Sequence, residues 1–337
     1  MSSRIKTTRT TVVLTLVIFL FLVPTFLKNP YWLHVLCIVG INVILVASVH
    51  TIRCTGELSL GTAGFMAVGA YASALLVMKG GLPVWVSMLL GGFLCAIVAL
   101  VLGYPFMRAK GIYFSILTLL TGEVFRLTAW YYRSLTGGSV GLTRIPSPDP
   151  IDIFGITTIV FNNKTAYYYL ILVVVLLSLL ILYRLQHSQV GFTWRTIRER
   201  DSLAASVGIN VLWSKIFAFA VGCFFTGLAG ALLAHFMHLL AADASGRFGM
   251  FTSIYILIYM VVGGEDKFAG PILGAFILTM LPEVFRPLQE YRPIIFGALV
   301  IAIVFFLPQG LIALPERLLS WGKKIAGQTR DARHQKP

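Results

Sequence analysis

Ionisable side chains are rare within the apolar stretches of this chain, so each one that occurs there is a candidate for chemistry. Glu123 and Arg126 lie three residues apart in the stretch 112–132. Opposite charges at this spacing share a helix face and can neutralise one another. A charge inside a membrane is costly and often marks a transport route. Two interpretations follow: the pair is self-contained, or Glu123 contacts a transported solute or relays a proton or cation.

A second set of ionisable residues lies near the ends of apolar stretches. Glu57 follows Arg53 by four residues, and we expect an interfacial acid or a local ion pair there. His235 and His238 share a helix face and precede Asp243. These ligand types can hold zinc, which would suit a membrane enzyme, but no spacing signature supports a metal site.

Motifs for nucleotide binding and covalent catalysis are absent from the sequence. There is no G-x-x-x-x-G-K-[ST] loop, no nucleophile elbow and no H-E-x-x-H pair. The four cysteines are widely spaced without a C-x-x-C pair, which predicts packing residues. The sequence therefore predicts a non-catalytic chain with no cofactor or metal of its own.

Membrane spans are the elements that must position these residues. Of the 337 residues, 58% are apolar and 12% are charged, and the mean hydropathy is +0.86. Crossing a hydrocarbon core takes about 20 apolar residues, and about ten such stretches recur. They are 11–26, 31–52, 58–78, 84–107, 112–132, 167–185, 216–240, 251–262, 268–285 and 294–307. We expect an all-α polytopic membrane protein of about ten transmembrane helices.

The net charge of +14 is spread along the chain in a pattern that indicates orientation. Basic residues precede the first stretch and accumulate in alternate joints, most of all in 184–215 and in the tail from Arg317. Cytoplasmic loops carry an excess of Lys and Arg, so we expect both termini on the cytoplasmic side. The basic residues form no single patch interleaved with aromatics, which argues against nucleic acid as a partner.

One predicted span is unusually rich in small residues. The stretch "TGELSLGTAGFMAVGAYASA" (55–74) contains Gly56, Gly61, Gly64 and Gly69. Small residues allow close helix packing or a break, and a broken backbone in lipid must be shielded by protein or line a cavity. Close packing alone is one interpretation, and the wall of a transport pathway is the other. The segment "VVGGEDKFAGPILGA" (261–275) is its counterpart in the second half.

The order of spans predicts two inverted repeats. Four spans in 31–133 begin outside and four in 216–310 begin inside, because one span intervenes. The remaining parts are an N-terminal helix (1–28), a periplasmic loop (134–166), a linking span with a cytoplasmic segment (167–215) and a basic cytoplasmic tail (311–337). We expect the Gly- and Pro-rich loop to be a non-helical cap or flap over the outer mouth.

The cytoplasmic joint predicts a short helix of its own. A first segment of helical character is followed by Asp201 as N-cap, the run "SLAASV", and Gly208 as the C-terminal stop. A two-turn helix is too short to anchor in a membrane interface by its own apolar area. We therefore expect it to dock to protein.

Several segments, in this order, resemble permease subunits of the branched-chain amino acid ABC importers. They are "TGELSLGTAGFMAVGAYASALL", "AKGIYFSILTLLTGEVFRLTAWYYRSLTGGSVGLTRIP", "VGFTWRTIRERDSLAASVGINVLWSKIFAFAVGCFFTGLAGALLAHF", "YMVVGGEDKFAGPILGAFILTMLPEVFR" and "FLPQGL". The resemblance implies an inverted-repeat, type II-like permease in the bacterial inner membrane that moves branched-chain or other small amino acids inward. Similar permeases serve urea, amide and aromatic-compound importers, so these cargoes stay open, as does an ion-coupled secondary transporter.

The resemblance also implies partners. They are a second, paralogous permease subunit, two ATPase subunits that bind ATP and Mg²⁺, a periplasmic or lipid-anchored substrate-binding protein, and membrane lipid. The stretch 202–208 corresponds to the coupling helix, and we expect ATPase closure to push on it and on 195–200. The coupling residues so assigned are Arg195, Arg198, Arg200, Asp201, Ser202, Leu203, Ala204, Ala205 and Gly208.

The pathway residues so assigned are Gly61, Thr62, Gly64, Phe65, Glu123, Gly263 and Gly264. Two positions depart from the family pattern close to this route. Thr62 stands where the family commonly has His, and residues 265–267 read Glu-Asp-Lys where it commonly has Gly-Leu-Gly.

Overall fold

The computed structural model describes residue 15 and residues 17–26, 29–109, 111–138, 140–153, 157–159, 161, 163–243, 246–284, 292–307 and 310–313. Every apolar stretch predicted from the sequence contains a helix; the first is described from residue 17 on, the third becomes helical only at Thr62, and the seventh ends in a strand. The helices are Val17–Phe26, α2 (Pro30–Arg53), α3 (Thr62–Met78), α4 (Val84–Phe106), α5 (Ile112–Tyr131), α7 (Lys164–Gln186), α10 (Val211–Met237), α11 (Met250–Gly263), α12 (Ala269–Val284) and α13 (Arg292–Phe306). The predicted tail lies outside the described residues from residue 314 on.

Length and composition make this chain a multi-pass membrane protein. Among the described residues, α2, α4, α5, α7 and α10 are long and apolar enough to cross a membrane, whereas α3, α11 and α12 are shorter apolar helices. Local sequence sets some of the boundaries. Asn29 accepts the Tyr31 N–H at 3.0 Å ahead of α2, and Asn210 accepts the Trp213 N–H at 3.2 Å ahead of α10. Such side chains satisfy N–H groups that the first helical turn leaves open.

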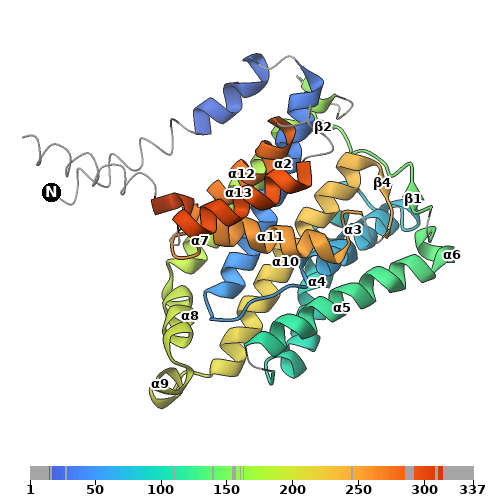
Figure 1. Ribbon diagram of the computed structural model, residues 1–337. Coiled ribbons are helices and arrows are strands. Elements are labelled where there is room, and N and C mark those ends of the chain that lie inside the picture. Colours follow the sequence, from blue (N-terminus) through green and yellow to red (C-terminus); the bar gives the residue numbers. More distant parts are fainter. Residues whose placement is uncertain are drawn as a thin grey trace, which may run out of the picture.

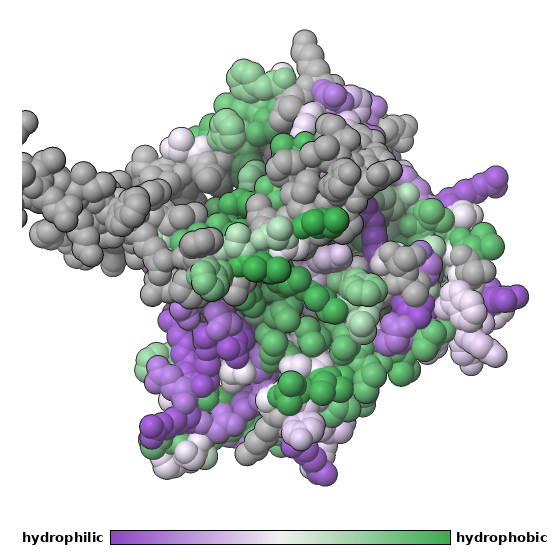
Figure 2. Space-filling view, viewed as in Figure 1, coloured by the Kyte–Doolittle hydropathy of each residue, from purple (hydrophilic) through white to green (hydrophobic). Residues whose placement is uncertain are grey.

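The bundle is built around α10, which contacts α2, α3 and α4 (Figure 1). Helix α2 packs in turn against α7, α11 and α12, while α3 packs against α4 and α5. The apolar windows of α2 and α10 are each 78% buried, whereas that of α5 is 28% buried. Figure 2 shows the consequence, a broad hydrophobic surface between hydrophilic regions, as expected for a protein surrounded by lipid.

The two ends of the bundle carry different structures. One end bears α8 (Gln189–Glu199) and α9 (Asp201–Ser206), at the lower left of Figure 1. The other bears α6 (Arg133–Thr136) and two antiparallel strand pairs. β1 (Leu142–Thr143) pairs with β4 (Leu239–Leu240), and β2 (Ile151–Ile153) pairs with β3 (Thr157–Ile159).

These strands correct the all-α expectation. The loop 134–166 is non-helical between Thr136 and Lys164 in its described part, as predicted. The pairing of β1 with β4 ties this loop to the chain that follows α10. Extended loop segments pair because they would otherwise leave backbone N–H and C=O groups without partners.

Candidate functional site

The helical path is interrupted between α2 and α3, where residues 57–61 form an irregular segment that we call the break. Side chains of α5 and α11 satisfy the backbone at and just after the break. Thr118 Oγ1 accepts the Leu60 N–H at 3.0 Å, Ser115 Oγ donates to the Leu58 carbonyl at 2.6 Å, and Ser253 Oγ accepts the Ala63 N–H at 2.9 Å. A non-helical backbone in a membrane-spanning bundle must be shielded by protein or line a cavity, and these bonds provide shielding by protein.

The glycines of this stretch lie at helix crossings. Gly64 of α3 is so close to α5 that an added Cβ would clash with the backbone of Gly122. Gly69 is packed in the same way against Gly227 of α10, and Gly61 lies against α5. Small residues permit such approaches between membrane helices. These glycines are therefore closely packed against neighbouring helices, and the assignment of Gly61 and Gly64 to a pathway stays a prediction.

Two further residues assigned to the pathway are buried at the same crossing. Thr62 is 4% exposed and Phe65 is 1% exposed. The Phe65 ring meets Phe125 of α5 and Phe219 of α10 edge to face, with centroids 5.4 and 5.5 Å apart. Either residue could contact a solute only if α3, α5 and α10 moved apart.

The second glycine pair forms the turn from α11 to α12. Gly263 packs against the backbone of Gly270, and Gly264 has φ +105°, a conformation that favours glycine. Gly310, which precedes the short helix η2 (Leu311–Ala313), packs against Gly264. The turn is therefore fixed by backbone contacts on two sides.

Glu123 and Arg126 form the self-contained pair that their spacing predicts. Glu123 Oε1 accepts from Arg126 Nε at 2.9 Å and also from Nη2, while Arg126 Nη1 donates to the Ala242 carbonyl at 2.8 Å. The Arg126 side chain is 8% exposed and that of Glu123 is 34% exposed. A proton relay through Glu123 would have to give up these bonds, so the pairing argues against that role.

The imidazoles considered as metal ligands are engaged with protein. The two ring nitrogens of His235 lie 2.9 Å from Ser73 Oγ and 2.8 Å from the Pro146 carbonyl. His238 Nδ1 lies 2.8 Å from the Ile145 carbonyl. Over the described residues, no group of three His, Cys, Asp or Glu side chains is placed to hold a metal ion. These imidazoles hold the loop after β1 against the end of α10.

The predicted coupling segment folds into α8 and α9. Trp194 anchors α8 with a side chain that is 0% exposed, and Ala204 anchors α9 in the same way. Gly208, with φ +84°, follows the end of α9 as predicted. Leu203 and Val207 are 56% and 73% exposed, so the protruding surface includes two large apolar side chains.

A groove opens beside α9, between the start of α10 and the end of α4. It is lined by Met107, Arg200, Asp201, Ser202, Ala205, Val211, Leu212 and Lys215. The structure thus brings four of the assigned coupling residues together around one groove. Arg195 lies apart from them, and its guanidinium donates to the Gln186 carbonyl at the end of α7 at 3.1 Å.

Asp201 does not cap α9, contrary to expectation. It is the first residue of the helix, and Arg200 at the cap position makes no capping bond with its side chain. The Asp201 carboxylate accepts from Lys215 Nζ at 2.8 Å, and the same ammonium donates to Glu57 Oε1 at 2.8 Å. We call Glu57, Asp201 and Lys215 the Lys215 triad. The expected local pairing of Glu57 with Arg53 is wrong, because α10 supplies a closer cation.

The triad lies largely inside the protein. The side chains of Lys215 and Glu57 are 9% and 7% exposed, and that of Asp201 is 41% exposed. Glu57 Oε2 is buried and has no hydrogen-bond partner among the described residues. Burying a charge is costly without a partner, so Lys215 is required to hold Glu57 at the break.

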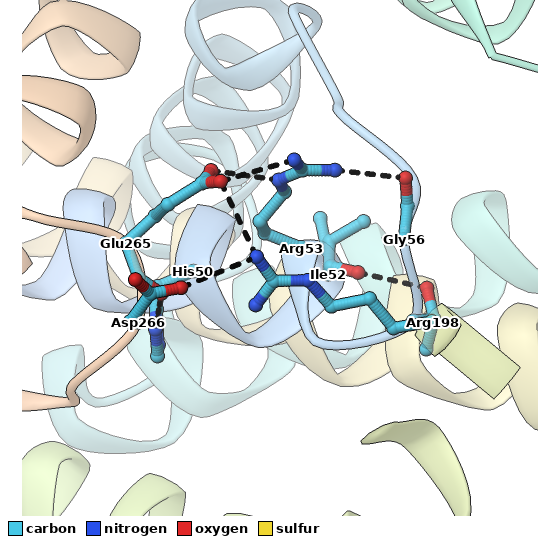
Figure 3. A network of polar contacts seen from close by, with 8 residues as sticks. His50, Ile52, Arg53, Gly56, Arg198, Glu265 and Asp266 are labelled. Atoms are coloured by element: carbon cyan, nitrogen blue, oxygen red, sulfur yellow. Dashed lines mark hydrogen bonds and ion pairs between the residues drawn. The ribbon is translucent and has the colours of Figure 1, made fainter. Parts of the chain in front are cut away.

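Arg53 pairs instead with Glu265, in the turn between α11 and α12 (Figure 3). Its Nε and Nη2 donate to the two carboxylate oxygens at 2.8 and 3.1 Å, and Arg198 of α8 adds a bond of 3.2 Å to Oε1. Arg198 also lies 3.6 Å from Asp266, and His50 Nε2 lies 3.0 Å from the Glu265 carbonyl.

We call Arg53, Arg198 and Glu265 the Glu265 network. The hydrogen bonds and charge of Arg53, with the charge of Arg198, hold the pKa of the Glu265 carboxyl below its usual value of 4.5, although burial acts in the opposite direction. The network joins α2, α8 and the α11–α12 turn, three elements that are distant in sequence.

Comparison with known proteins decides what kind of protein carries these features. A family model described as "Branched-chain amino acid transport system / permease component" matches residues 31–305. The chain belongs to this family. The permease is 29% identical over 299 residues to the high-affinity branched-chain amino acid transport system permease protein LivM of Salmonella typhimurium and to that of Escherichia coli, covering 84% of this chain and 68% of either relative.

A more distant relative of the permease is LivH, the high-affinity branched-chain amino acid transport system permease protein of Salmonella typhimurium. It is 24% identical over 134 residues, which cover 39% of this chain and 42% of LivH. No solved structure matches the permease. Family membership makes the chain a transport subunit. A site built from packing contacts and ion pairs is consistent with transport.

Lys215 was not among the residues predicted to be functional. In the sequence it closes the basic joint 184–215, yet it is the fifth residue of the apolar helix α10. The reasoning applied to Glu123, that a charge within a span needs a reason, would have singled it out. Its two partners could not be found this way, since they lie in other elements.

Proposed function

We propose that this permease is the membrane subunit of an ABC importer that moves branched-chain amino acids into a bacterial cell across the inner membrane. The observation that carries the proposal is the family match over residues 31–305, which spans α2 to α13 almost completely. The LivM relatives, with names that specify branched-chain amino acid transport, support this cargo over urea, amides or aromatic compounds.

The contacts between helices support two inverted repeats, α2 to α5 and α10 to α13, within 31–133 and 216–310. Helix α10 contacts α3 and α4, and α2 contacts the corresponding helices α11 and α12. Likewise α3 contacts α4 and α5, and α11 contacts α12 and α13. Opposed repeats with broken helices between them are typical of transporters. We include ten spans and two cytoplasmic termini in this proposal.

In this proposal α9 docks to an ATPase subunit. The helix protrudes from the bundle, exposes Leu203 and Val207, and borders the groove beside α10. The LivH relative supports a paralogous second permease. Two ATPase subunits would bind ATP and Mg²⁺, and a periplasmic or lipid-anchored protein would deliver the amino acid.

The proposed route runs where α3, α5 and α10 meet. Gly61, Gly64 and the residues between and after them would become accessible only when these helices separate, because they are buried in the present arrangement. The turn at Gly263 and Gly264 would line the corresponding part of the route in the second repeat. Glu123 contributes a partly exposed carboxylate to α5, already neutralised by Arg126. A small amino acid would pass mainly by fit and transient polar contacts.

Purification of the tagged permease from its native membrane tests the proposal. We expect a second permease and an ATPase to co-purify, and we expect leucine uptake by proteoliposomes that contain the whole complex, its binding protein and internal ATP. Uptake by the permease alone, independent of ATP and abolished by an ionophore, would instead identify a secondary transporter. Uptake of urea or an amide but not leucine would overturn the proposed cargo, while the proposal that the permease belongs to an importer would stand.

A further inference from the structure

We propose that Lys215 and Asp201 are positioning residues that transmit the movement of α9 to the break between α2 and α3. The inference rests on the proposed function, since it specifies how contact with an ATPase at α9 would reach the transport route. It assigns the Lys215 triad a role in coupling as well as in stability.

The first step is the attachment of α9. This helix has six residues, contacts α8 and α10, and buries only Ala204 completely. The 2.8 Å ion pair between Asp201 and Lys215 ties its first turn to α10. A displacement of α9 therefore acts directly on the Lys215 ammonium, because the Asp201 carboxylate must follow the helix backbone that bears it.

The second step is the link from Lys215 to Glu57. The ammonium donates to Glu57 Oε1 at 2.8 Å, and Glu57 Oε2 is buried with no partner in the described part of the chain. A buried carboxylate cannot be left without its cation at low cost. Glu57 must therefore accompany Lys215 when the ammonium moves, or the pair must be exposed to water.

The third step is the link from the break to the helices around it. Residues just after Glu57 are bonded to α5 and α11 through Thr118 and Ser253. The same segment leads into α3, which meets α5 at Gly64. A shift of Glu57 would therefore pull on the crossing of α3 with α5, which has to open in the proposed route.

The Glu265 network supplies a fixed point for this movement. Arg198 holds α8 to the α11–α12 turn through Glu265, and Trp194 is completely buried. Helix α9 is joined to α8 through Arg200, which is extended at φ −156° and ψ 110°. We infer that α8 stays with the bundle while α9 moves about this junction, which makes Asp201 and Lys215 the path for the movement.

The test compares transport with ATP hydrolysis in proteoliposomes that contain the complete importer, its binding protein and leucine. We expect Asp201→Asn to leave ATP hydrolysis within about twofold of wild type and to lower leucine uptake per ATP by about tenfold, which corresponds to about 1.4 kcal/mol, because the ion pair between Asp201 and Lys215 is lost. Lys215→Met also leaves the buried Glu57 without its cation and is expected to lower leucine uptake per ATP, whereas Lys215→Arg, which keeps the charge, is expected to retain most of the coupling.

Asp201 is the decisive position because its side chain is 41% exposed and its loss need not prevent folding. Lys79→Met is the matched control, since Lys79 lies at the other end of the bundle and donates to the Ser134 carbonyl at 3.3 Å. Wild-type uptake per ATP in Asp201→Asn would overturn the inference, whatever Lys215→Met does. A wild-type complex that takes up no leucine would contradict the proposed function instead, so the two failures are distinguishable.

Discussion

At the scale of single residues, the Lys215 triad and the Glu265 network are ion pairs between elements that are separate in sequence. Glu265 and Asp266 are neighbours with the same charge, yet the Glu265 side chain is 31% exposed between two arginines and that of Asp266 is 79% exposed. A partly buried carboxylate held by two guanidinium groups contributes more than a solvated one, because water screens the latter. The Glu265 network is therefore the place where a single substitution should have a measurable effect.

We expect Glu265→Gln to lower the stability of the purified permease by about 1–3 kcal/mol, because Arg53 and Arg198 lose a charged acceptor. The folded state lowers the pKa of Glu265 from 4.5, so its contribution is complete above pH 4.5 and is lost as the pH falls through the lowered value. Thermal unfolding in detergent between about pH 6 and pH 3 should therefore show a steeper acid loss for wild type than for the variant.

Asp266→Asn provides the control for this experiment. Its side chain is 79% exposed and lies 3.6 Å from Arg198, where water screens the pair, so we expect the wild-type acid profile. Parallel profiles for wild type and Glu265→Gln would show that the network does not stabilise the fold.

At the scale of elements, glycines decide how closely the helices cross. The α3–α5 and α3–α10 crossings are both backbone-to-backbone contacts at glycine, and the break between α2 and α3 is bonded to side chains of α5. In a membrane, apolar burial gives little advantage over lipid, so association depends on close packing and hydrogen bonds. A methyl group added at such a crossing should therefore lower the stability of the permease by more than its small volume suggests.

We expect Gly64→Ala to destabilise the permease by about 1–3 kcal/mol, because the new Cβ would clash with the backbone of Gly122 and α3 would have to shift. Gly297→Ala in α13 is the matched control, since a Cβ there meets nothing within 4 Å. Helix propensity favours the control substitution by up to about 1 kcal/mol. The measurement is the unfolding temperature of both variants in detergent, and equal losses in both would contradict the packing account.

At the scale of the whole molecule, the bundle has two unlike ends with an apolar surface between them (Figure 2). The predicted coupling segment, α8–α9, lies at one end and the β1–β4 pair at the other, joined by the length of α10. A membrane perpendicular to this direction would place them on opposite sides. The proposed orientation puts α9 in the cytoplasm.

Cysteine labelling of intact cells tests this orientation. We expect a membrane-impermeant maleimide to label Ser134→Cys in α6 but to leave Ser206→Cys in α9 unlabelled until the membrane is opened. Both serines are exposed, and the native Cys37, Cys54, Cys95 and Cys223 are buried, so the unmodified permease serves as the unlabelled background. The reverse labelling pattern would invert the proposed topology.

The helices could be predicted from the sequence alone, because a bilayer requires long apolar segments, and each predicted stretch contains a helix in the described residues. The sequence also determined local features: the Glu123–Arg126 pair, a separate α9 and the stop at Gly208. Tertiary structure alone decided the partners of Glu57, Asp201 and Arg53. These bonds join residues from 14 to 212 positions apart, and hydropathy and spacing report only on neighbours along the chain. Which charges meet depends on how the helices pack, since buried carboxylates take whichever cation the fold brings within reach.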